Sequence, residues 1–173
     1  IIARTGTPET TGFYLLHEGV VRAQDGTIQE IDYSDMPDFP VVAGDGAIDR
    51  VEVSENGWIG FTDKYWMATL IAAPGQAFSS VAKYTASNDT YQTDMRLPVM
   101  EVAPGATIRS ASSLFAGAKV ANTIRAYQNE RSIANFYDSI DWGWFYFLTK
   151  PMFWLLNFIH GLVGNMGWAI IGL

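Results

Sequence analysis

The side chains that could carry out acid–base catalysis are few and lie far apart in the sequence. The chain contains two histidines, His17 and His160. His17 is followed by Glu18, and a histidine beside a carboxylate is a candidate general base. Consecutive residues of a strand point to opposite faces, so these two side chains would not contact the same substrate. We therefore expect His17 to have a structural or surface role.

Other candidate sites lack the groups that their chemistry requires. Asp63 and Lys64 could act as a catalytic pair, but an ion pair in a turn is the simpler interpretation. The stretch GDGAIDR, residues 44–50, resembles part of a calcium loop and lacks the remaining acidic ligands. The sequence has no cysteine, no spacing typical of metal ligands, no glycine-rich phosphate-binding motif and no nucleophile elbow. We expect no catalytic residue, cofactor or metal ion, and we predict that the protein is not an enzyme.

The charges divide the chain into an acidic part and an apolar part. The 173 residues are enough for one full domain. The net charge of −7 argues against a nucleic-acid partner, because phosphate binding requires clustered Lys and Arg. Residues 9–63 contain twelve Asp or Glu and two Arg, whereas residues 142–173 contain one charged residue, Lys150. The composition therefore changes sharply near residue 141.

Turn signals divide the first part of the chain into strands. Asp25-Gly26 predicts a hairpin, Asn56-Gly57 a second turn, and Pro104-Gly105 the turn of a further strand pair. The run KYWMATLIAA, residues 64–73, is almost continuously apolar, which predicts a strand buried on both faces. Residues 37–47 are typical of a loop. Several strands separated by turns, with no helix between them, predict an antiparallel β-sandwich.

After residue 117 the apolar residues recur with the period of a helix. Val120, Ile124 and Tyr127 share one face. This spacing predicts a helix from about Lys119 to Gln128, and we expect a second helical turn at residues 132–136. These are ordinary amphipathic segments, which we expect to pack on the sheet.

The stretch DWGWFYFLTKPMFWLLNFIHGLVGN, residues 141–165, has two unequal faces on a helix of about 100° per residue. The narrow face carries the polar groups Thr149, Lys150, Asn157 and His160, and the wide face carries aromatic and aliphatic side chains. Tryptophan and tyrosine are favoured at membrane–water interfaces, where a helix with a broad apolar face can lie in the plane of the membrane. We therefore predict a helix that lies on a membrane surface.

Two alternatives stay open for this stretch. It could be a core helix, although its apolar face is wider than a single sheet contact would cover. It could also belong to one transmembrane helix from residue 151 to residue 173, which is long enough to span a bilayer. That helix would bury Asn157, His160 and Asn165 in lipid, which is costly. Pro151 either kinks the helix or occupies its first turn.

A new apolar run follows the Gly164-Asn165 break. The eight residues from Met166 extend about 12 Å as a helix, which is short of a ~30 Å hydrocarbon core. We interpret this run as the start of a transmembrane helix. Few basic residues flank it, so the acidic domain before it fits the non-cytoplasmic side of the membrane.

Four stretches of the sequence resemble the YidC family of bacterial inner-membrane protein insertases. They are YLLHEGVVRAQDGTIQEIDY, GWIGFTDKYWMATLI, SLFAGAK and SIDWGWFYFLTKPMFWLLNFIHGLVGNMGWAII, and they occur in the family's order. The last resembles the junction between the large periplasmic domain and the second transmembrane helix. The resemblance extends from about Tyr14 to Leu173.

The resemblance implies a mainly β fold, an antiparallel β-supersandwich that is partial in this chain, followed by C-terminal α-helices. It is similar to the fold of sugar mutarotases. We expect a periplasmic sandwich at residues 1–117, whose N-terminal part is missing, and a helical connector at residues 118–141. An amphipathic membrane-interface helix would then occupy residues 142–164, and a transmembrane helix would start at residues 165–173.

The resemblance also implies a function without covalent chemistry or cofactor. Members of the family insert and fold inner-membrane proteins, alone or with the Sec translocon. The expected partners are the phospholipid membrane, nascent membrane proteins and the Sec translocon, and not nucleic acid. The expected location is the bacterial inner membrane, in a multi-pass protein, with this segment mainly on the periplasmic side. The family's insertion-groove residues have no counterpart in this sequence, so none is assigned.

The residues expected to attach the domain to the membrane fall into three groups. Lys150 would reach the lipid headgroups, and residues 118–137 would couple the sandwich to the attachment helix. The start of the span would be Trp168, Ala169, Ile170 and Ile171. The side chains expected in the membrane interface are Trp142, Trp144, Phe145, Phe147, Trp154, Leu155 and Phe158.

Two other functions stay open. A membrane-tethered carbohydrate-binding or mutarotase-like sandwich would need an acid–base pair across a cleft, such as His17 and Asp63 facing one pocket. A docking module for another envelope protein would be favoured by a large exposed apolar patch on the sandwich.

Overall fold

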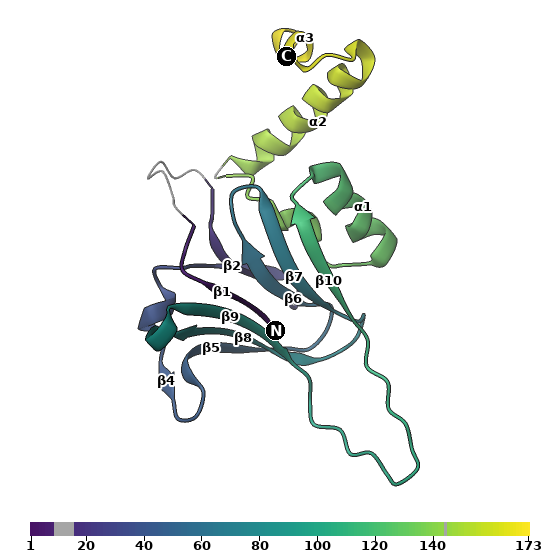
Figure 1. Cartoon of the computed structure of the whole chain (residues 1–173). Coiled ribbons are helices and arrows are strands. Elements are labelled where there is room, and N and C mark those ends of the chain that lie inside the picture. Colours follow the sequence, from purple (N-terminus) through teal and green to yellow (C-terminus); the bar gives the residue numbers. More distant parts are fainter. Residues whose placement is uncertain (9–15, 144) are drawn as a thin grey trace. The chain divides into compact units, whose positions relative to one another are not determined.

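The computed structural model (Figure 1) describes residues 1–8, 16–143 and 145–173 of the chain. The chain forms two compact units, Ile1–Ile140 and Asp141–Leu173. Among the described residues, the first contains the strands, the α-helix α1 and three short 3-10 turns, of which η2 covers Ala86–Asn88, and the second contains two α-helices.

Within the described residues, the first unit consists of two five-stranded antiparallel sheets. This arrangement confirms the predicted antiparallel sandwich followed by helices. Sheet A has the order β1 (Ile2–Thr5), β9 (Thr90–Arg96), β8 (Phe78–Thr85), β5 (Gly46–Val53) and β4 (Val41–Val42). Sheet B has the order β10 (Ser112–Ala118), β7 (Trp66–Ala72), β6 (Trp58–Thr62), β2 (Gly19–Gln24) and β3 (Thr27–Asp32).

The Asp25-Gly26 turn joins β2 to β3 as predicted. Both residues have positive φ, 46° and 87°, as a tight hairpin turn requires, and Gln24 pairs with Thr27 directly across it. The Asp25 carboxylate also accepts hydrogen bonds from the backbone N–H and the hydroxyl of Ser54. The hairpin is thereby connected to the segment that leaves β5.

The predicted turn at Asn56-Gly57 has a different role from that of a hairpin. It follows β5 of sheet A and precedes β6 of sheet B, so the chain crosses from one sheet to the other at this point. Asn56 has a φ of 51°. A Cβ atom on Gly57 would lie 2.5 Å from Val53 Cγ1 and 2.8 Å from the carbonyl oxygen of Ala23, so only glycine fits.

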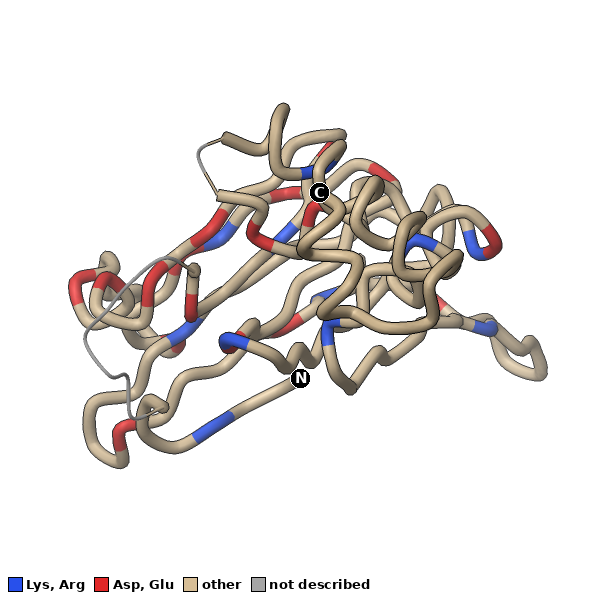
Figure 2. Tube along the Cα trace, turned by 90° about the horizontal axis from the view of Figure 1, so that it is seen from above, with Lys and Arg blue, Asp and Glu red and all other residues tan. Residues whose placement is uncertain are grey.

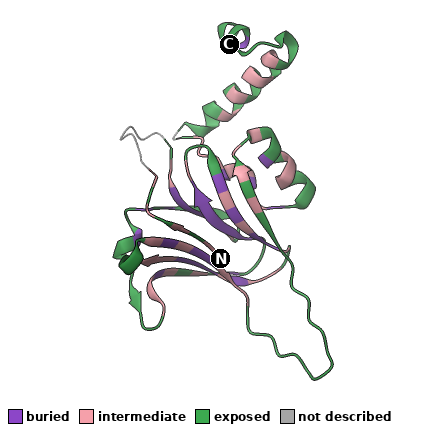
Figure 3. Ribbon diagram, viewed as in Figure 1, coloured by how far each residue is buried: buried purple, intermediate pink, exposed green. Residues whose placement is uncertain are grey.

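The inner core lies between the two sheets, with buried strands at its centre (Figure 3). The close approach of β6 to its neighbours depends on Gly60, where a Cβ atom would lie 2.0 Å from the carbonyl oxygen of Ala68. The buried residues of this core are Val20, Ile31, Tyr33, Met36, Val53, Ile59, Phe61, Ala72, Phe78, Ala82 and Tyr91.

The outer core lies between sheet B and the helical segments α1 (Ala121–Arg131) and η3 (Phe136–Ser139). Ile124, Phe136 and Trp58 are fully buried there. The indole N–H of Trp58 donates to the carbonyl oxygen of Ala134 at 2.8 Å, which holds the segment between α1 and η3 against the sheet. This packing agrees with the expectation that the helices cover the sheet.

The helical segments are displaced by a few residues from their predicted positions. Helix α1 was predicted at residues 119–128 and occupies Ala121–Arg131, and the second helical turn lies at Phe136–Ser139 rather than at 132–136. Ser132 and Asn135 both have a φ of 54°. These left-handed residues end the first helix and precede the second turn.

The prediction that β7 is buried on both faces is wrong. Met67 and Ile71 are buried against the outer core, and Ala72 belongs to the inner core. Trp66 is 63% exposed, although its position in the alternating strand places it on the same face as Ala72. Ala68 and Leu70 of the same face are half-buried, so the apolar run has one covered face and one that the described residues cover only in part.

The strand pair predicted around Pro104-Gly105 is only partly correct, because its two arms contain β9 and β10, which lie in different sheets and do not pair with each other. The turn is present, since Gly105 has a φ of 81° and the Ala106 N–H donates to the Ala103 carbonyl at 2.9 Å. Residues 97–111 nevertheless form no strand, and they extend away from the sandwich between β9 and β10 (Figure 1). A strand requires a hydrogen-bonded neighbour, and residues 97–111 have none among the described residues.

Residues 37–47, predicted as a loop, contain short regular elements at both ends. The η1 turn covers Met36–Asp38, β4 covers Val41–Val42, and β5 begins at Gly46. The loop prediction is therefore correct only for the residues between these elements.

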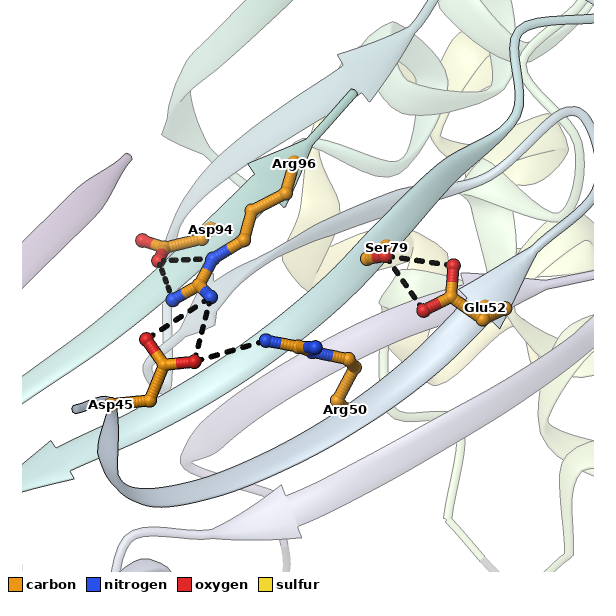
Figure 4. Close-up of polar contacts among 6 residues, drawn as sticks. All are labelled: Asp45, Arg50, Glu52, Ser79, Asp94 and Arg96. Atoms are coloured by element: carbon orange, nitrogen blue, oxygen red, sulfur yellow. Dashed lines mark hydrogen bonds and ion pairs between the residues drawn. The ribbon is translucent and has the colours of Figure 1, made fainter. Parts of the chain in front are cut away.

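The outer face of sheet A carries a network of ion pairs (Figure 4). Arg96 forms ion pairs with Asp94 at 3.0 Å and with Asp45 at 3.1 Å, and Arg50 contacts Asp45 at 3.0 Å. Val81, which pairs with Arg50 and Asp94 in the sheet, is fully buried on this face. Arginine stems can cover apolar surface in this way while their charged ends reach water.

Candidate membrane-attachment site

Helix α2 spans Tyr146–Val163. It begins four residues after the predicted start at residue 142, because Gly143 has a φ of 71° and interrupts the helical conformation. The helix ends at Gly164, which has a φ of 69° and donates its N–H to the carbonyl oxygen of His160 at 2.7 Å. Pro151 lies in the second turn and not in the first, and the helix continues beyond it.

One face of α2 presents large apolar side chains that no described part of the chain covers. Phe147 is 67% exposed, Trp154 60% and Phe158 53%. The rings of Trp154 and Phe158 stack with their centroids 5.7 Å apart. The other exposed apolar residues of this region are Phe145, Leu148, Met152, Leu155, Leu162 and Val163. A soluble helix would normally bury such a face, so this surface requires an apolar environment.

Lys150 lies beside two aromatic rings at the start of α2. Its Nζ atom lies 5.9 Å from the ring centroid of Trp142 and 5.8 Å from that of Tyr146. Trp142 also makes an edge contact with Phe153, with centroids 5.4 Å apart. Figure 2 shows the charged residues along the chain, and Lys150 is the one Lys, Arg, Asp or Glu of residues 142–173.

The polar side chains of α2 bond back to their own helix. The Thr149 hydroxyl donates to the carbonyl oxygen of Phe145 at 3.0 Å, and the Asn157 amide donates to that of Phe153 at 2.8 Å. These bonds reduce the cost of bringing the two polar groups near an apolar phase. They are consistent with a helix that lies at a boundary between water and lipid.

Helix α3 spans Met166–Ile171, and Asn165 caps its N-terminus. The Asn165 side-chain oxygen accepts from the N–H groups of Gly167 and Trp168. Ala169 is fully buried, whereas Trp168, Ile170 and Ile171 are exposed. None of the helices within residues 1–8, 16–143 and 145–173 is both long and apolar enough to cross a membrane.

The structure brings most of the predicted attachment residues to one segment. Phe145, Phe147, Trp154, Leu155 and Phe158 are exposed on or beside α2, whereas Trp142 is half-buried against Lys150 and Phe153. Trp144, which was also predicted to anchor the helix, lies outside the described residues. Phe147, Trp154 and Phe158 therefore lie on the helix as its apolar period indicated, whereas Trp142 and Phe145 precede it.

The residues considered for catalysis do not form one site. Nδ1 of His17 lies 2.9 Å from Asp32 Oδ1, and its Nε2 lies 3.0 Å from the carbonyl oxygen of Val20. Asp63 instead forms an ion pair with Arg4 at 2.9 Å. His17 and Asp63 therefore each have a different partner and do not act on a common point, and the contacts of His17 support the structural role expected for it.

The expected partner of Asp63 was wrong. Its carboxylate binds Arg4 of sheet A rather than the adjacent Lys64, whose Nζ lies over the ring of Tyr65. The Tyr33 hydroxyl donates to Asp63 at 3.1 Å and accepts from Arg4. Burial of Tyr33, together with the Asp63 charge, raises the pKa of its hydroxyl. This cluster connects the two sheets.

Two further polar clusters could not be found from the sequence. Arg22 is fully buried and forms an ion pair with Asp49 of the opposite sheet. Burial lowers the pKa of Arg22, and the Asp49 carboxylate opposes this shift. Asp45, from the stretch that resembled a calcium loop, binds Arg50 and Arg96. The described residues contain no group of three or more His, Asp or Glu that could hold a metal ion.

The fold and the C-terminal segment together define a class of protein, an antiparallel β-sandwich domain that carries an amphipathic helix with an exposed aromatic face. The sequence profile of the YidC periplasmic domain matches residues 1–155. The chain therefore belongs to the YidC periplasmic domain family, and the resemblance found in the sequence is confirmed.

The similar proteins are named membrane protein insertase YidC. The one from Paracoccus denitrificans is 59% identical over 173 residues and matches the whole of this chain, which corresponds to 27% of its own length. The one from Jannaschia sp. is 52% identical over 192 residues, covering all of this chain and 31% of the relative. The one from Dinoroseobacter shibae is 56% identical over 172 residues, covering 99% and 28% respectively. The chain therefore spans less than a third of the length of these relatives.

Proposed function

We propose that this chain is the periplasmic module of a membrane protein insertase, and that residues 142–164 attach it to the periplasmic surface of the bacterial inner membrane. The exposed aromatic face of α2 supports this proposal most directly, because Phe147, Trp154 and Phe158 remain uncovered in a segment with one charged side chain. A helix with these properties lies in the interface with its apolar side toward the acyl chains.

Lys150 is positioned to assist this attachment. Its ammonium group lies beside the rings of Trp142 and Tyr146. In the membrane, the rings would lie at the level of the lipid headgroups and Lys150 would contact the lipid phosphates. Residues 166–171 would then begin a transmembrane helix. Its first residues in the lipid would be Trp168, Ala169, Ile170 and Ile171.

The whole protein would insert and fold inner-membrane proteins in a multi-pass arrangement, alone or together with the Sec translocon. The relatives support this part of the proposal, since each of them is named as a membrane protein insertase.

The test is an insertion assay with the full-length protein in proteoliposomes and a single-span client. The double variant Trp154→Glu, Phe158→Glu should reduce insertion several-fold, because the attachment helix no longer holds the module at the membrane. The control is Val41→Glu, since Val41 is an exposed apolar residue of the sandwich, at 81% exposed. Equal insertion by the double variant and the wild type would contradict the role proposed for α2.

A further inference from the structure

The arginines that belong to strands and helices of the first unit fall into two groups. Those of the strands each form an ion pair with an aspartate, and they are Arg4, Arg22, Arg50 and Arg96. Those of α1 lie over tyrosine rings instead. The Cζ atom of Arg125 is 6.0 Å from the ring centroid of Tyr137, and that of Arg131 is 5.5 Å from that of Tyr127. Within the described residues, neither arginine of α1 forms an ion pair with a carboxylate.

The two arginines of α1 are arranged to bind an anion from outside the unit. Both side chains are exposed. A guanidinium group carries five N–H donors in one plane, which match the oxygen atoms of a phosphate or a carboxylate. A contact with an aromatic ring restrains the long side chain and leaves these donors available, so less conformational entropy is lost when an anion binds. The surface of α1 therefore offers two restrained cationic groups that the fold does not neutralise by an ion pair.

The charge of the unit favours an anionic partner at this surface and not elsewhere. Residues 9–63 contain twelve Asp or Glu and two Arg, so this part of the sandwich repels an anionic surface. Residues 118–140, which form the helical segments, have an excess of basic residues. They contain Lys119, Arg125 and Arg131 as bases and Glu130 and Asp138 as acids.

The chain leaves the first unit beside α1. Ile140, the last residue of this unit, packs against the outer core, to which Ile124 of α1 also belongs. Six residues, 140–145, separate η3 from α2, and an extended chain of this length reaches about 20 Å at most. Once residues 142–164 bind the membrane, the end of the unit beside α1 is therefore held close to the lipid headgroups.

We propose that Arg125 and Arg131 bind the phosphate groups of anionic phospholipids, so that α1 forms a second contact of the module with the membrane. This inference rests on the proposed function, because it takes the attachment of residues 142–164 as its starting point. Helix α2 supplies mainly apolar contacts, which depend little on the lipid headgroup. The two arginines add a preference for membranes that are rich in anionic lipid.

Binding of the 173-residue chain to vesicles tests the proposal, with vesicles of phosphatidylcholine alone and of phosphatidylcholine mixed with phosphatidylglycerol. Arg125→Gln and Arg131→Gln should each weaken binding to the mixed vesicles by about fivefold. Neither should change binding to phosphatidylcholine alone. The matched control is Arg109→Gln, which removes the same charge from an exposed position in residues 97–111 and should weaken binding by less than about twofold.

Several results of this experiment would overturn the proposal. An equal loss of binding for Arg109→Gln would show that only the net charge matters. Unchanged binding of both α1 variants would assign the arginines to another partner, such as an acidic protein segment. If inorganic phosphate at constant ionic strength removed the difference between the α1 variants and the wild type, the arginines would bind a dissolved anion and not a membrane.

The same assay separates this inference from the proposed function. Trp154→Glu should weaken binding to both kinds of vesicle, because it acts on the apolar face of α2. If Trp154→Glu weakens binding and the α1 variants do not, only the present inference fails. If Trp154→Glu binds both kinds of vesicle as the wild type does, the proposed function fails whatever the α1 variants show.

A spin label on α1 provides a second measurement, in the reconstituted full-length protein and with both arginines intact. Asn129 is exposed and lies one turn after Arg125, on the same side of the helix. We expect a paramagnetic lipid headgroup to relax a label at position 129 strongly, and a label at the exposed position of Val41 weakly. Equally weak relaxation at the two positions would place α1 in water and would overturn the proposal.

Discussion

The rings of Trp154 and Phe158 stack on the exposed face of α2, with their centroids 5.7 Å apart and their planes 12° from parallel. The two residues are four positions apart, so they lie one above the other on the same side of the helix. Together they form a flat aromatic surface that no described residue covers. This surface is the feature on which the proposed attachment to the membrane depends.

Replacing Trp154 by glutamate should weaken the binding of the 173-residue chain to phospholipid vesicles by about tenfold or more. The substitution removes an apolar ring from the interface and places a charge there. One factor of ten corresponds to about 1.4 kcal/mol. Vesicle flotation measures the effect, and Val41→Glu serves as the control for an added charge. Unchanged flotation of the Trp154 variant would show that this ring does not contact lipid.

Replacing Trp58 by phenylalanine should destabilise the sandwich by about 2–3 kcal/mol. The change leaves a small cavity in the outer core and deprives the Ala134 carbonyl of its hydrogen bond. Urea unfolding measures the difference in free energy. Tyr65→Phe, at an exposed position in the turn between β6 and β7, should cost less than about 0.5 kcal/mol. If the two variants were equally stable, Trp58 would not hold the helical segment on the sheet.

Replacing Gly60 by alanine should destabilise the sandwich by at least about 2 kcal/mol. The new Cβ atom would lie 2.0 Å from the Ala68 carbonyl oxygen, so β6 and β7 would have to separate. Gly161→Ala in α2 is the matched control. Its new Cβ would lie within 4 Å of no atom outside the backbone of its own helix, and alanine has a higher helix propensity than glycine. Urea unfolding followed by near-ultraviolet circular dichroism distinguishes them, and equal stability would contradict the close approach of β6 and β7.

Lowering the pH should destabilise the first unit in part through Asp45. The hydrogen bond from Arg96 and the positive charges of Arg96 and Arg50 hold the pKa of Asp45 below its ordinary value. Because the folded-state pKa is below the unfolded-state value of about 4, the carboxylate stabilises the fold above that pH, and this contribution is lost as the pH falls through the folded-state pKa.

The corresponding measurement is the melting temperature between pH 6 and pH 3. Between pH 6 and pH 3, the melting temperature of the Asp45→Asn variant should fall less than that of the wild type, because the amide of the variant takes up no proton. Identical pH profiles for the two proteins would show that the contacts of Asp45 with Arg50 and Arg96 do not contribute to acid stability.

Local patterns in the sequence were sufficient for the elements that depend on neighbouring residues. The Asp25-Gly26 hairpin forms because the two residues accept positive φ, and α2 has an apolar face because its residues recur at helical spacing. The displacement of η3 has a local cause as well, but Ser132 and Asn135 are not glycine, so their left-handed conformation gave no clear signal.

Features that depend on distant residues could not be predicted. The Arg4–Asp63 ion pair joins positions 59 residues apart, and the sequence offered Lys64 as a nearer partner for Asp63. The apolar run of β7 predicted burial on both faces, but Trp66 on the inner face is 63% exposed. Residues 97–111 could form a strand only by pairing with a neighbouring strand. The local sequence does not show whether such a strand is available.

Spin-label depth measurements in the reconstituted full-length protein test the proposed attachment most directly, with labels at positions 147, 157 and 170. The account predicts that a label replacing Phe147 lies at a shallow depth among the acyl chains, that one replacing Asn157 lies in water or among the headgroups, and that one replacing Ile170 lies deep in the bilayer. A deep position for the label at Asn157 would contradict the account and favour a single transmembrane helix from residue 151 to residue 173.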